Sequence, residues 1–367
     1  MQLKHIFLSL GLLSLAGLKG AAQSSATNPF TTTAVPFLRI SPDARAGGMG
    51  DAGLATTPDA NSGFWNLAKT PFAKSKSAVS ATYSPWLKEI NGEMHMASLT
   101  GYYQLENEQA LSASVRYFNM GSIEQTDYNG TLQQTNQPRE FAIDLGYSRA
   151  LSQKAGVGVA LRYIHSKLTE GNLNGTDYKA GSAVAADLSF FYNGLNEKGQ
   201  GWSWGAALSN LGSKINYSNN ATGKDFIPAK LGIGGAYTTV FDEDNKLTFA
   251  ADFNKLLVPS VANDPESETD YHNKGVVESW AQSFSDYNRF QFAAGAEYLF
   301  KGQFALRAGY NAETKQEGGR HYFTAGAGIN YQSFGFNFSY LAPFNDDNVR
   351  SPLSNTMRFG LIYHLEQ

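Results

Sequence analysis

Residues 323–340 read FTAGAGINYQSFGFNFSY, and every second residue of this stretch is apolar. The alternation covers 323–331 and 334–340, and only the dipeptide Gln332-Ser333 separates the two runs. A period of two is the pattern of a β-strand with one apolar face, and a very short connection joins antiparallel neighbours. The stretch therefore predicts a β-hairpin.

The same period recurs from Ser77 to the end of the chain. The apolar runs are 79–83, 97–105, 111–117, 141–147, 157–163, 184–192, 202–208, 231–237, 247–253, 292–300, 304–310, 323–331, 334–340 and 357–365. No charge interrupts the apolar face. The alternate positions carry the charges: Arg116, Glu140, Asp144, Arg162, Asp187, Lys230, Lys246, Asp252, Glu297, Arg307 and Arg358. We therefore predict fourteen strands, each with one apolar and one polar face.

The strands of a soluble β-sandwich also alternate apolar and polar residues. Two features favour a membrane barrel over such a sandwich. Most apolar runs end in Tyr or Phe, so strands that alternate in direction place aromatic rings at both membrane interfaces. The connections alternate between short turns and long loops, the longest running from about 254 to 289. Short periplasmic turns and long external loops are typical of outer-membrane barrels. The predicted fold is all-β, a 14-stranded antiparallel transmembrane β-barrel with its charges in the lumen.

Composition narrows the function classes. The first residues have Lys4 and His5, an apolar run to Leu18 and the small residues Gly20-Ala21-Ala22, which predicts a signal peptide over 1–22. The chain has no Cys, so disulfides and thiolate metal sites are excluded. A net charge of −3 gives no basic footprint for nucleic acid. The mean hydropathy of the chain is −0.33. Because no second apolar run is long enough to span a bilayer as a helix, a helical membrane protein is excluded.

The remaining part, residues 23–76, precedes the first predicted strand and contains scattered aromatic residues. A barrel of fourteen strands has a lumen too wide for its own wall side chains to fill. We therefore predict three parts: a signal peptide (1–22), a plug segment inside the lumen (23–76) and the barrel (77–367).

A match to G-x-G-x-x-G at residues 48–53 raises the question of a dinucleotide site. Such a site needs a following helix and a parallel sheet, and neither is predicted here. We instead expect the glycines to permit close backbone approach between plug and wall, with the nearby charges pairing with wall charges. The residues assigned to the plug contact are Asp43, Arg45, Gly48, Gly50, Asp51 and Gly53.

No catalytic constellation is predicted. His165 and Ser166 are neighbours, so on a strand they point to opposite faces. An enzyme acting on outer-leaflet lipid needs a His and a Ser together on the lipid-facing side, and the apolar runs suggest no such pair. We expect no enzyme activity, no cofactor and no bound metal.

The stretch PFLRISPDARAGGMGDAGLATTPDANSGFWNLAK (36–69), followed by YSPWL (83–87), resembles the PorV family of type IX secretion outer-membrane proteins. The wider relatives are FadL-like transporters, which implies fourteen strands and an N-terminal plug. The resemblance implies a shuttle that receives exported cargo by its C-terminal signal domain. Its implied partners are the giant SprA/Sov-like translocon barrel, a PorU-like sortase and attachment complex, cargo signal domains, and outer-membrane lipid and lipopolysaccharide.

No motif of the family identifies the residues that touch cargo. Aromatic residues on exposed loops are common binding anchors, and the long external loop contains Tyr271, Trp280, Phe284 and Tyr287. The alternative is a FadL-like channel for hydrophobic small molecules. It predicts a continuous apolar pocket beside the plug and a lateral opening in the wall.

Overall fold

The computed structural model describes residues 33–126, 130–173, 176–219, 223–259, 265–285, 289–344, 351 and 353–366. The predicted signal peptide and the first ten residues of the predicted plug lie outside the described residues. No helix in these ranges is long and apolar enough to cross a membrane.

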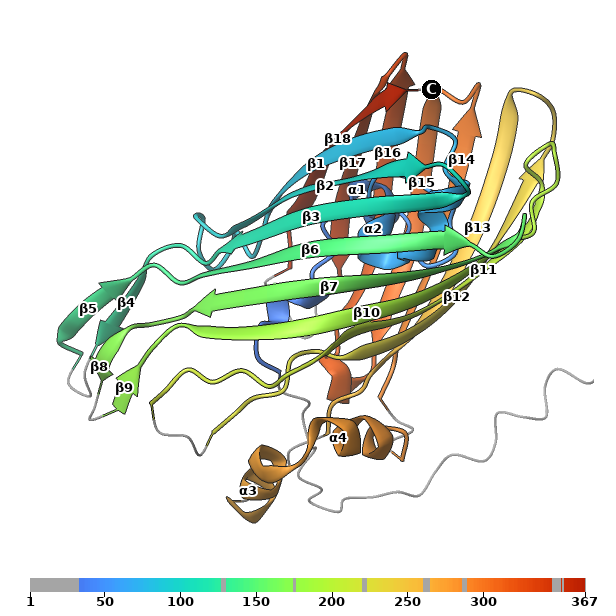
Figure 1. The fold of residues 1–367 in the computed structure, drawn as a ribbon. Helices are drawn as coiled ribbons and strands as arrows, with labels where there is room; N and C mark the ends of the chain where they lie inside the picture. The colour runs from blue at the N-terminus through green and yellow to red at the C-terminus, as the bar shows by residue number, and fades with distance from the viewer. Residues whose placement is uncertain are drawn as a thin grey trace, which may run out of the picture.

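Fourteen strands of the described chain close into one antiparallel barrel (Figure 1). They are β1 (Ser77–Pro85), β2 (His95–Leu105), β3 (Gln109–Asn119), β6 (Arg139–Ala150), β7 (Ala155–Lys167), β10 (Gly181–Asn193), β11 (Gly201–Gly212), β12 (Lys230–Val240), β13 (Asn245–Leu256), β14 (Gln291–Phe300), β15 (Phe304–Glu313), β16 (His321–Tyr331), β17 (Phe334–Pro343) and β18 (Thr356–Glu366). Each strand pairs with its neighbour along the chain, and β18 pairs with β1. The predicted fold class is confirmed, because every predicted apolar run lies in one of these strands.

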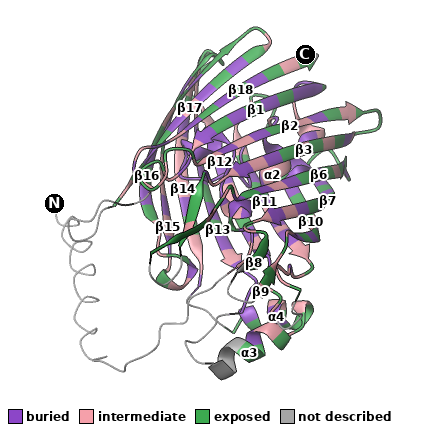
Figure 2. Ribbon diagram, turned by 90° about the vertical axis from the view of Figure 1, so that its left-hand side faces the viewer, coloured by how far each residue is buried: buried purple, intermediate pink, exposed green. Residues whose placement is uncertain are grey.

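The two faces of the wall differ as the alternation predicts. Leu145 and Leu161 are 65% and 66% exposed on the outer face, although both are large and apolar. Arg162, next to Leu161 in the chain, points inward and is buried. Figure 2 shows the resulting alternation of buried and exposed residues along the strands. An apolar belt outside and a charged interior suit a barrel surrounded by lipid.

The short connections between strands lie at one end of the barrel and the long connections at the other. Short turns such as 106–108 and 332–333 lie at the end where the chain terminates. The long connections lie at the other, external end, and they contain structure that the sequence did not predict. These elements are the hairpins β4 (Ile123–Thr126)–β5 (Leu132–Asn136) and β8 (Gly171–Leu173)–β9 (Thr176–Tyr178), the helices α3 (Pro265–Asn273) and α4 (Val276–Ser283), and the 3₁₀ turn η3 (Lys315–Glu317).

The residues before β1 fold inside the barrel as short turns of helix. They are η1 (Pro36–Arg39), α1 (Ala44–Gly47), α2 (Ser62–Trp65) and η2 (Leu67–Phe72). Figure 1 shows them enclosed by the strands, with α1 and α2 in the half nearer the short turns. We call the described part of this region, residues 33–76, the plug segment.

The plug segment extends along the lumen. At the external end, Phe37 is fully buried and stacks on Phe118 of β3, with ring centroids 6.5 Å apart. At the other end, Thr70 Oγ1 lies 2.7 Å from Ser148 Oγ of β6. The amide of Gln104 on β2 donates to the carbonyl oxygen of Thr70 at 3.0 Å. The segment is therefore held to the wall at both ends.

Candidate functional site

The glycines of 48–53 meet glycines of the wall. A Cβ on Gly326 of β16 would lie 2.9 Å from the Cα of Gly48, and one on Gly309 of β15 would collide with the backbone of Met49 and Gly50. Backbone therefore packs on backbone without side chains between them. The G-x-G-x-x-G match is followed by no helix of the kind a dinucleotide site requires, because α2 starts nine residues later and has four residues.

Gly50 leaves no room for a side chain in this contact. Its φ is +70°, a conformation that favours glycine. A Cβ there would lie 2.6 Å from the amide nitrogen of Tyr310. The backbone of Gly50 is also fixed by hydrogen bonds, since its N–H donates to Thr324 Oγ1 at 2.8 Å and its carbonyl accepts from Asn311 Nδ2 at 2.8 Å.

Gly53 is fixed in a different way. Its N–H and that of Leu54 donate to one carboxylate oxygen of Asp252 on β13, at 2.7 and 2.9 Å. The indole ring of Trp65 covers the position where a side chain of Gly53 would begin. The ammonium of Lys69 donates to the carbonyl of Gly53 at 2.7 Å, and burial lowers the pKa of Lys69 to about 8.

Of the three charged residues assigned to the plug contact, Arg45 and Asp51 pair with the wall. Arg45 binds Glu297 of β14 through two hydrogen bonds, Nε–Oε2 at 2.9 Å and Nη2–Oε1 at 2.8 Å. Asp51 accepts from Arg358 of β18 at 2.7 and 3.2 Å. All four side chains are largely buried. Buried charge pairs of this geometry lock position, because removing one partner leaves the other uncompensated.

Asp43 differs from the expectation, because its partners lie within the plug. Its carboxylate accepts from the indole Nε1 of Trp65 at 3.0 Å, from Asn61 Nδ2 at 3.2 Å and from the backbone N–H of Arg45 at 2.8 Å. Asp43 is the residue that caps α1. Burial raises the pKa of this carboxyl to about 6, and the nearby charge of Asp59 adds to the effect. Asp43 therefore shapes the plug and does not anchor it.

A second charge network lies within the wall, and sequence reasoning placed its members in the lumen without pairing them. Asp144 on β6 forms ion pairs with Arg162 on β7 and with Arg116 on β3, the latter at 3.4 Å. Arg162 also reaches Asp187 on β10 at 2.8 Å. Asp144 and Arg162 are direct cross-strand partners, so the hairpin register gave a signal for this pair.

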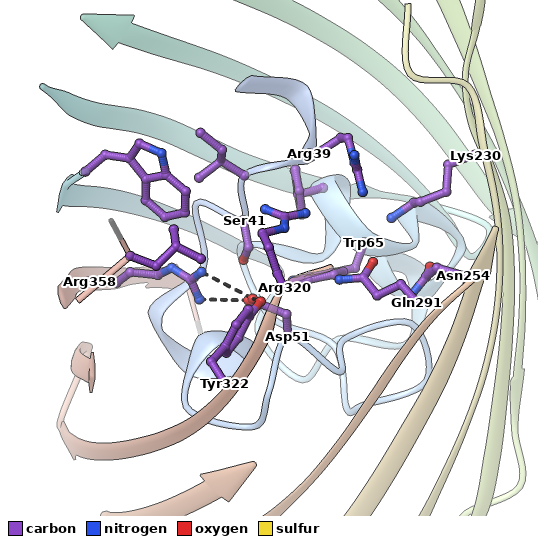
Figure 3. A pocket seen from close by; sticks show the side chains of 14 residues that line it. Arg39, Ser41, Asp51, Trp65, Lys230, Asn254, Gln291, Arg320, Tyr322 and Arg358 are labelled. Atoms are coloured by element: carbon purple, nitrogen blue, oxygen red, sulfur yellow. Dashed lines mark hydrogen bonds and ion pairs between the residues drawn. The ribbon is translucent and has the colours of Figure 1, made fainter. Parts of the chain in front are cut away.

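Between plug and wall, near the external end, lies a cavity of about 30 Å³ (Figure 3). Its lining is mostly polar: Arg39, Ile40, Ser41, Asp51, Phe64, Trp65, Trp86, Lys230, Asn254, Gln291, Arg320, Tyr322, Leu353 and Arg358. A buried cavity that accepts benzene has a volume of about 150 Å³ and an apolar lining. The cavity is therefore too small and too polar for a hydrophobic molecule.

The predicted partner-binding residues that the structure describes differ in how exposed they are. Tyr271 is only 4% exposed, and its ring meets that of Phe226 at 5.1 Å, so it belongs to the core of the loop. Trp280 is partly buried, whereas Phe284 is 57% exposed. Tyr287 lies outside the described residues. Phe284 is thus the member of the set that is freely available on the external surface.

Helix α4 turns its apolar face outward. Val277, Trp280 and Phe284 follow the spacing of one helical face, and Val277 is 71% exposed. The side toward the loop core carries the buried Ser279 and Ser283 and the partly buried Val276, which packs against that core. A surface helix usually buries its apolar face, but here part of the apolar surface is left as a stripe at the external end of the barrel. We call Val277, Trp280 and Phe284 the α4 stripe.

The expectation that no His and Ser meet on the lipid-facing side is wrong. His165 Nδ1 lies 3.2 Å from Ser182 Oγ on the outer face near the external end, because β7 and β10 place the two residues directly opposite each other. Within the described residues His165 has no carboxylate partner, although a triad requires one to orient the imidazole. The ring of His165 instead packs against Phe141 at 5.1 Å.

Comparison with known proteins identifies the family of this chain. The profile of the family described as "Type IX secretion system protein PorV" matches residues 23–263, about two thirds of the chain. The chain belongs to the PorV family. It is therefore an outer-membrane component of type IX secretion, with the fourteen-stranded barrel described above. No curated protein sequence matches it significantly.

The fold is shared with solved barrels of low sequence identity. The toluene transporter TbuX of Ralstonia pickettii superposes with a TM-score of 0.54 at 11% identity, over 88% of this chain and 97% of that chain. The toluene transporter TodX of P. putida gives a TM-score of 0.50 at 11% identity, over 86% of this chain and 95% of that chain. At such identities these likenesses establish the fold alone.

Proposed function

We propose that this PorV-family barrel is a cargo-binding shuttle without enzymatic activity. It receives exported proteins by their C-terminal signal domains from the translocon barrel. It then presents them at the cell surface to a PorU-like sortase and attachment complex. The proposal includes the division into a signal peptide (1–22), a plug (23–76) and a barrel (77–367). The match to the family profile over residues 23–263 carries it.

The lumen geometry favours binding outside the barrel over passage through it. The plug is fixed by buried ion pairs on β14 and β18, and the cavity beside it holds about 30 Å³. Strand pairing is continuous around the wall, with a defined register for every neighbouring pair including β1–β18. A cargo protein therefore meets this chain at its external loops, where the α4 stripe is exposed.

The α4 stripe supplies the chemistry of a protein contact. Exposed apolar and aromatic side chains gain free energy when a partner covers them, and such residues dominate binding energies at interfaces. We propose that Phe284 and Val277 contact cargo or an attachment-complex subunit. Tyr271 supports the loop beneath them and makes no contact with a partner.

The test isolates tagged protein from native membranes and identifies what is recovered with it. We expect a giant barrel, a sortase and signal-bearing cargo with the wild type. The double variant Val277→Ser/Phe284→Ser should lose at least one of these partners. Glu278→Gln, an exposed change on the same helix but off the stripe, should lose none.

Deletion of the gene gives an independent readout, because signal-bearing cargo should then accumulate in the periplasm. Normal surface attachment of cargo in the deletion strain would contradict the proposed function. Recovery of the tagged protein alone with bound fatty acid would instead support the FadL-like channel for hydrophobic small molecules.

A further inference from the structure

The outward face of the wall carries two cations at the external ends of β6 and β7. Arg139 and Lys167 are direct cross-strand partners, and they continue the outward rows that contain Phe141 and His165. Arg139 is exposed and Lys167 is half-buried. Like charges directly opposite each other on one face of a sheet destabilise the pairing, so this position favours the binding of an anion.

The described chain supplies little negative charge to this pair. Glu170 forms an ion pair with Lys167, but its side chain is 62% exposed, and exposed pairs contribute little. None of the ion pairs of the described residues involves Arg139. Glu140, the acid next to it in the sequence, is buried on the lumen side and accepts from Ser166 Oγ at 2.7 Å. One exposed acid therefore faces two cations, and positive charge remains.

The neighbouring outward positions contain no further acid. Asn119 of β3 lies opposite Arg139. The next row toward the membrane is aromatic and polar, and it consists of Tyr117, Phe141, His165 and Ser182. Further along the same face, Leu145 and Leu161 lie opposite each other and are mostly exposed. The outward face of these strands thus changes from cations through aromatic rings to aliphatic side chains.

The two cations lie at the depth of lipid headgroups. The 12 residues of β6 span roughly 30 Å along the barrel axis, at a rise of about 3.3 Å per residue and a tilt of about 40°. The apolar band of an outer-membrane barrel is about 25 Å tall. Arg139 is the first residue of β6 and therefore lies just outside this band on the external side. Arg149, also outward, lies near the other end of β6 at the opposite interface.

The opposite side of the barrel has no such pair. In the order of the closed barrel, β15 and β16 lie half-way around from β6 and β7 (Figure 1). The outward residues at the external ends of β15 and β16 are Ala312 and His321, followed by Tyr310 and Phe323. These positions hold no Lys or Arg, so the cation pair is a local feature of one side of the wall.

We propose that Arg139 and Lys167 bind a phosphate of lipid A, the membrane anchor of lipopolysaccharide in the outer leaflet. Phosphorylated lipid A carries its phosphates directly above its acyl chains, so its charge and its apolar part match the order of side chains on this face. The guanidinium of Arg139 binds two phosphate oxygens, and the ammonium of Lys167 adds a point charge. Phe141 and His165 lie beside the sugar, and the acyl chains cover the aliphatic rows.

The test measures binding of lipid A to the purified full-length protein in detergent micelles by native mass spectrometry. Each cation near an anionic lipid contributes about fivefold to affinity, so the two contribute about thirtyfold. The wild type should bind phosphorylated lipid A about thirtyfold more tightly than dephosphorylated lipid A. Arg139→Gln/Lys167→Gln should lose this preference. Arg149→Gln, which removes an outward cation from the other end of β6, should keep it.

Equal binding of the two lipid A forms by the wild type would overturn the proposal, even if the double variant did not fold. An undiminished preference in the double variant, or an equal loss in Arg149→Gln, would contradict it as well. Displacement of lipid A by millimolar inorganic phosphate would assign the site to the free ion instead. The site goes beyond the proposed function, because purified protein binds lipid without cargo or sortase, so the two can fail separately.

Discussion

The lumen and the external loops of this barrel place charged and apolar side chains in opposite ways. In the lumen, charged side chains are buried and paired, as in the contact between Arg45 and Glu297. In the loops, apolar side chains such as Val277 and Phe284 face outward. The first arrangement fixes one conformation, because each buried charge depends on its partner. The second leaves free energy to be gained on binding, because apolar surface remains in water.

Under the proposed function, this contrast separates the part of the molecule that maintains the fold from the part that binds partners. The plug is held to the wall by buried ion pairs. Under the proposed function a partner contacts the external face, so mutations in the two regions should have different phenotypes. Lumen changes should affect stability first, and loop changes should affect partner capture first.

The most disruptive single change should be Gly50→Ala. The new Cβ would meet the backbone of Tyr310 on β15, and alanine is disfavoured at a φ of +70°. We expect a loss of about 4 kcal/mol in the free energy of unfolding, measured with denaturant in detergent micelles.

Gly63→Ala is the matched control in the same plug. The nearest atoms to a Cβ there are 3.9 Å away, and Gly63 lies in α2, where alanine is the better helix former. Its unfolding free energy should change by less than about 1 kcal/mol, on the stabilising side. Equal effects of the two substitutions would show that the plug does not pack on the wall as described.

Arg45→Met should rank next. It leaves Asp59 and one side of Glu297 without their cation in the lumen, at a cost of about 3 kcal/mol. Lys301→Met removes a cation from an exposed pair with Asp244, and its cost should stay below about 0.5 kcal/mol. The same unfolding experiment measures both, and a small loss for Arg45→Met would mean that the lumen is as well hydrated as the periplasmic turns.

The strands of the barrel wall can be predicted from the sequence far better than the contacts of the plug inside the lumen. Strand alternation is a local pattern, so a run such as 334–340 shows by itself which of its residues face lipid. The partner of Arg45 is 252 residues away in the sequence, and no local pattern points to Glu297. Asp43 and Asp51 are acids in the same short stretch, yet only the fold decides that one caps a helix while the other meets Arg358.

Loop structure escaped prediction for a different physical reason. The segment PESETDYHN of α3 is almost entirely polar, so it has no apolar period to signal a helix. In α4 the apolar period exists, but Val277 and Phe284 face outward while Val276 packs against the loop core. The aromatic residue type alone therefore could not distinguish Tyr271 from Phe284, although Tyr271 lies in the core of the loop and Phe284 on its surface.

Asp43 should make plug stability depend on pH. Burial raises the pKa of this carboxyl from its usual 3.8 to about 6, so the folded protein holds the proton more tightly than the unfolded chain. The stabilisation is fully present below pH 3.8 and is lost as the pH rises through about 6. Its size is on the order of 2 to 3 kcal/mol.

Comparison with Asp43→Asn isolates this effect from the other acids of the lumen. Unfolding free energies measured from about pH 4 to pH 7 should fall for the wild type relative to the variant over that interval. Parallel pH profiles for the two proteins would show that Asp43 is solvated, and a rise of the wild type relative to the variant would show that its charged form is the one stabilised by the fold.

The smallest effect on stability should come from the loop surface. Val277→Ser/Phe284→Ser removes two side chains that are mostly in water, so the unfolding free energy should change by less than about 0.5 kcal/mol. Tyr271→Ala, which empties the contact with Phe226 and Val258, should cost about 3 kcal/mol locally, seen as faster proteolysis of the loop. If the double variant were instead destabilised as strongly as Tyr271→Ala, the stripe would be part of the loop core, and the division between a closed lumen and an open binding surface would fail at α4.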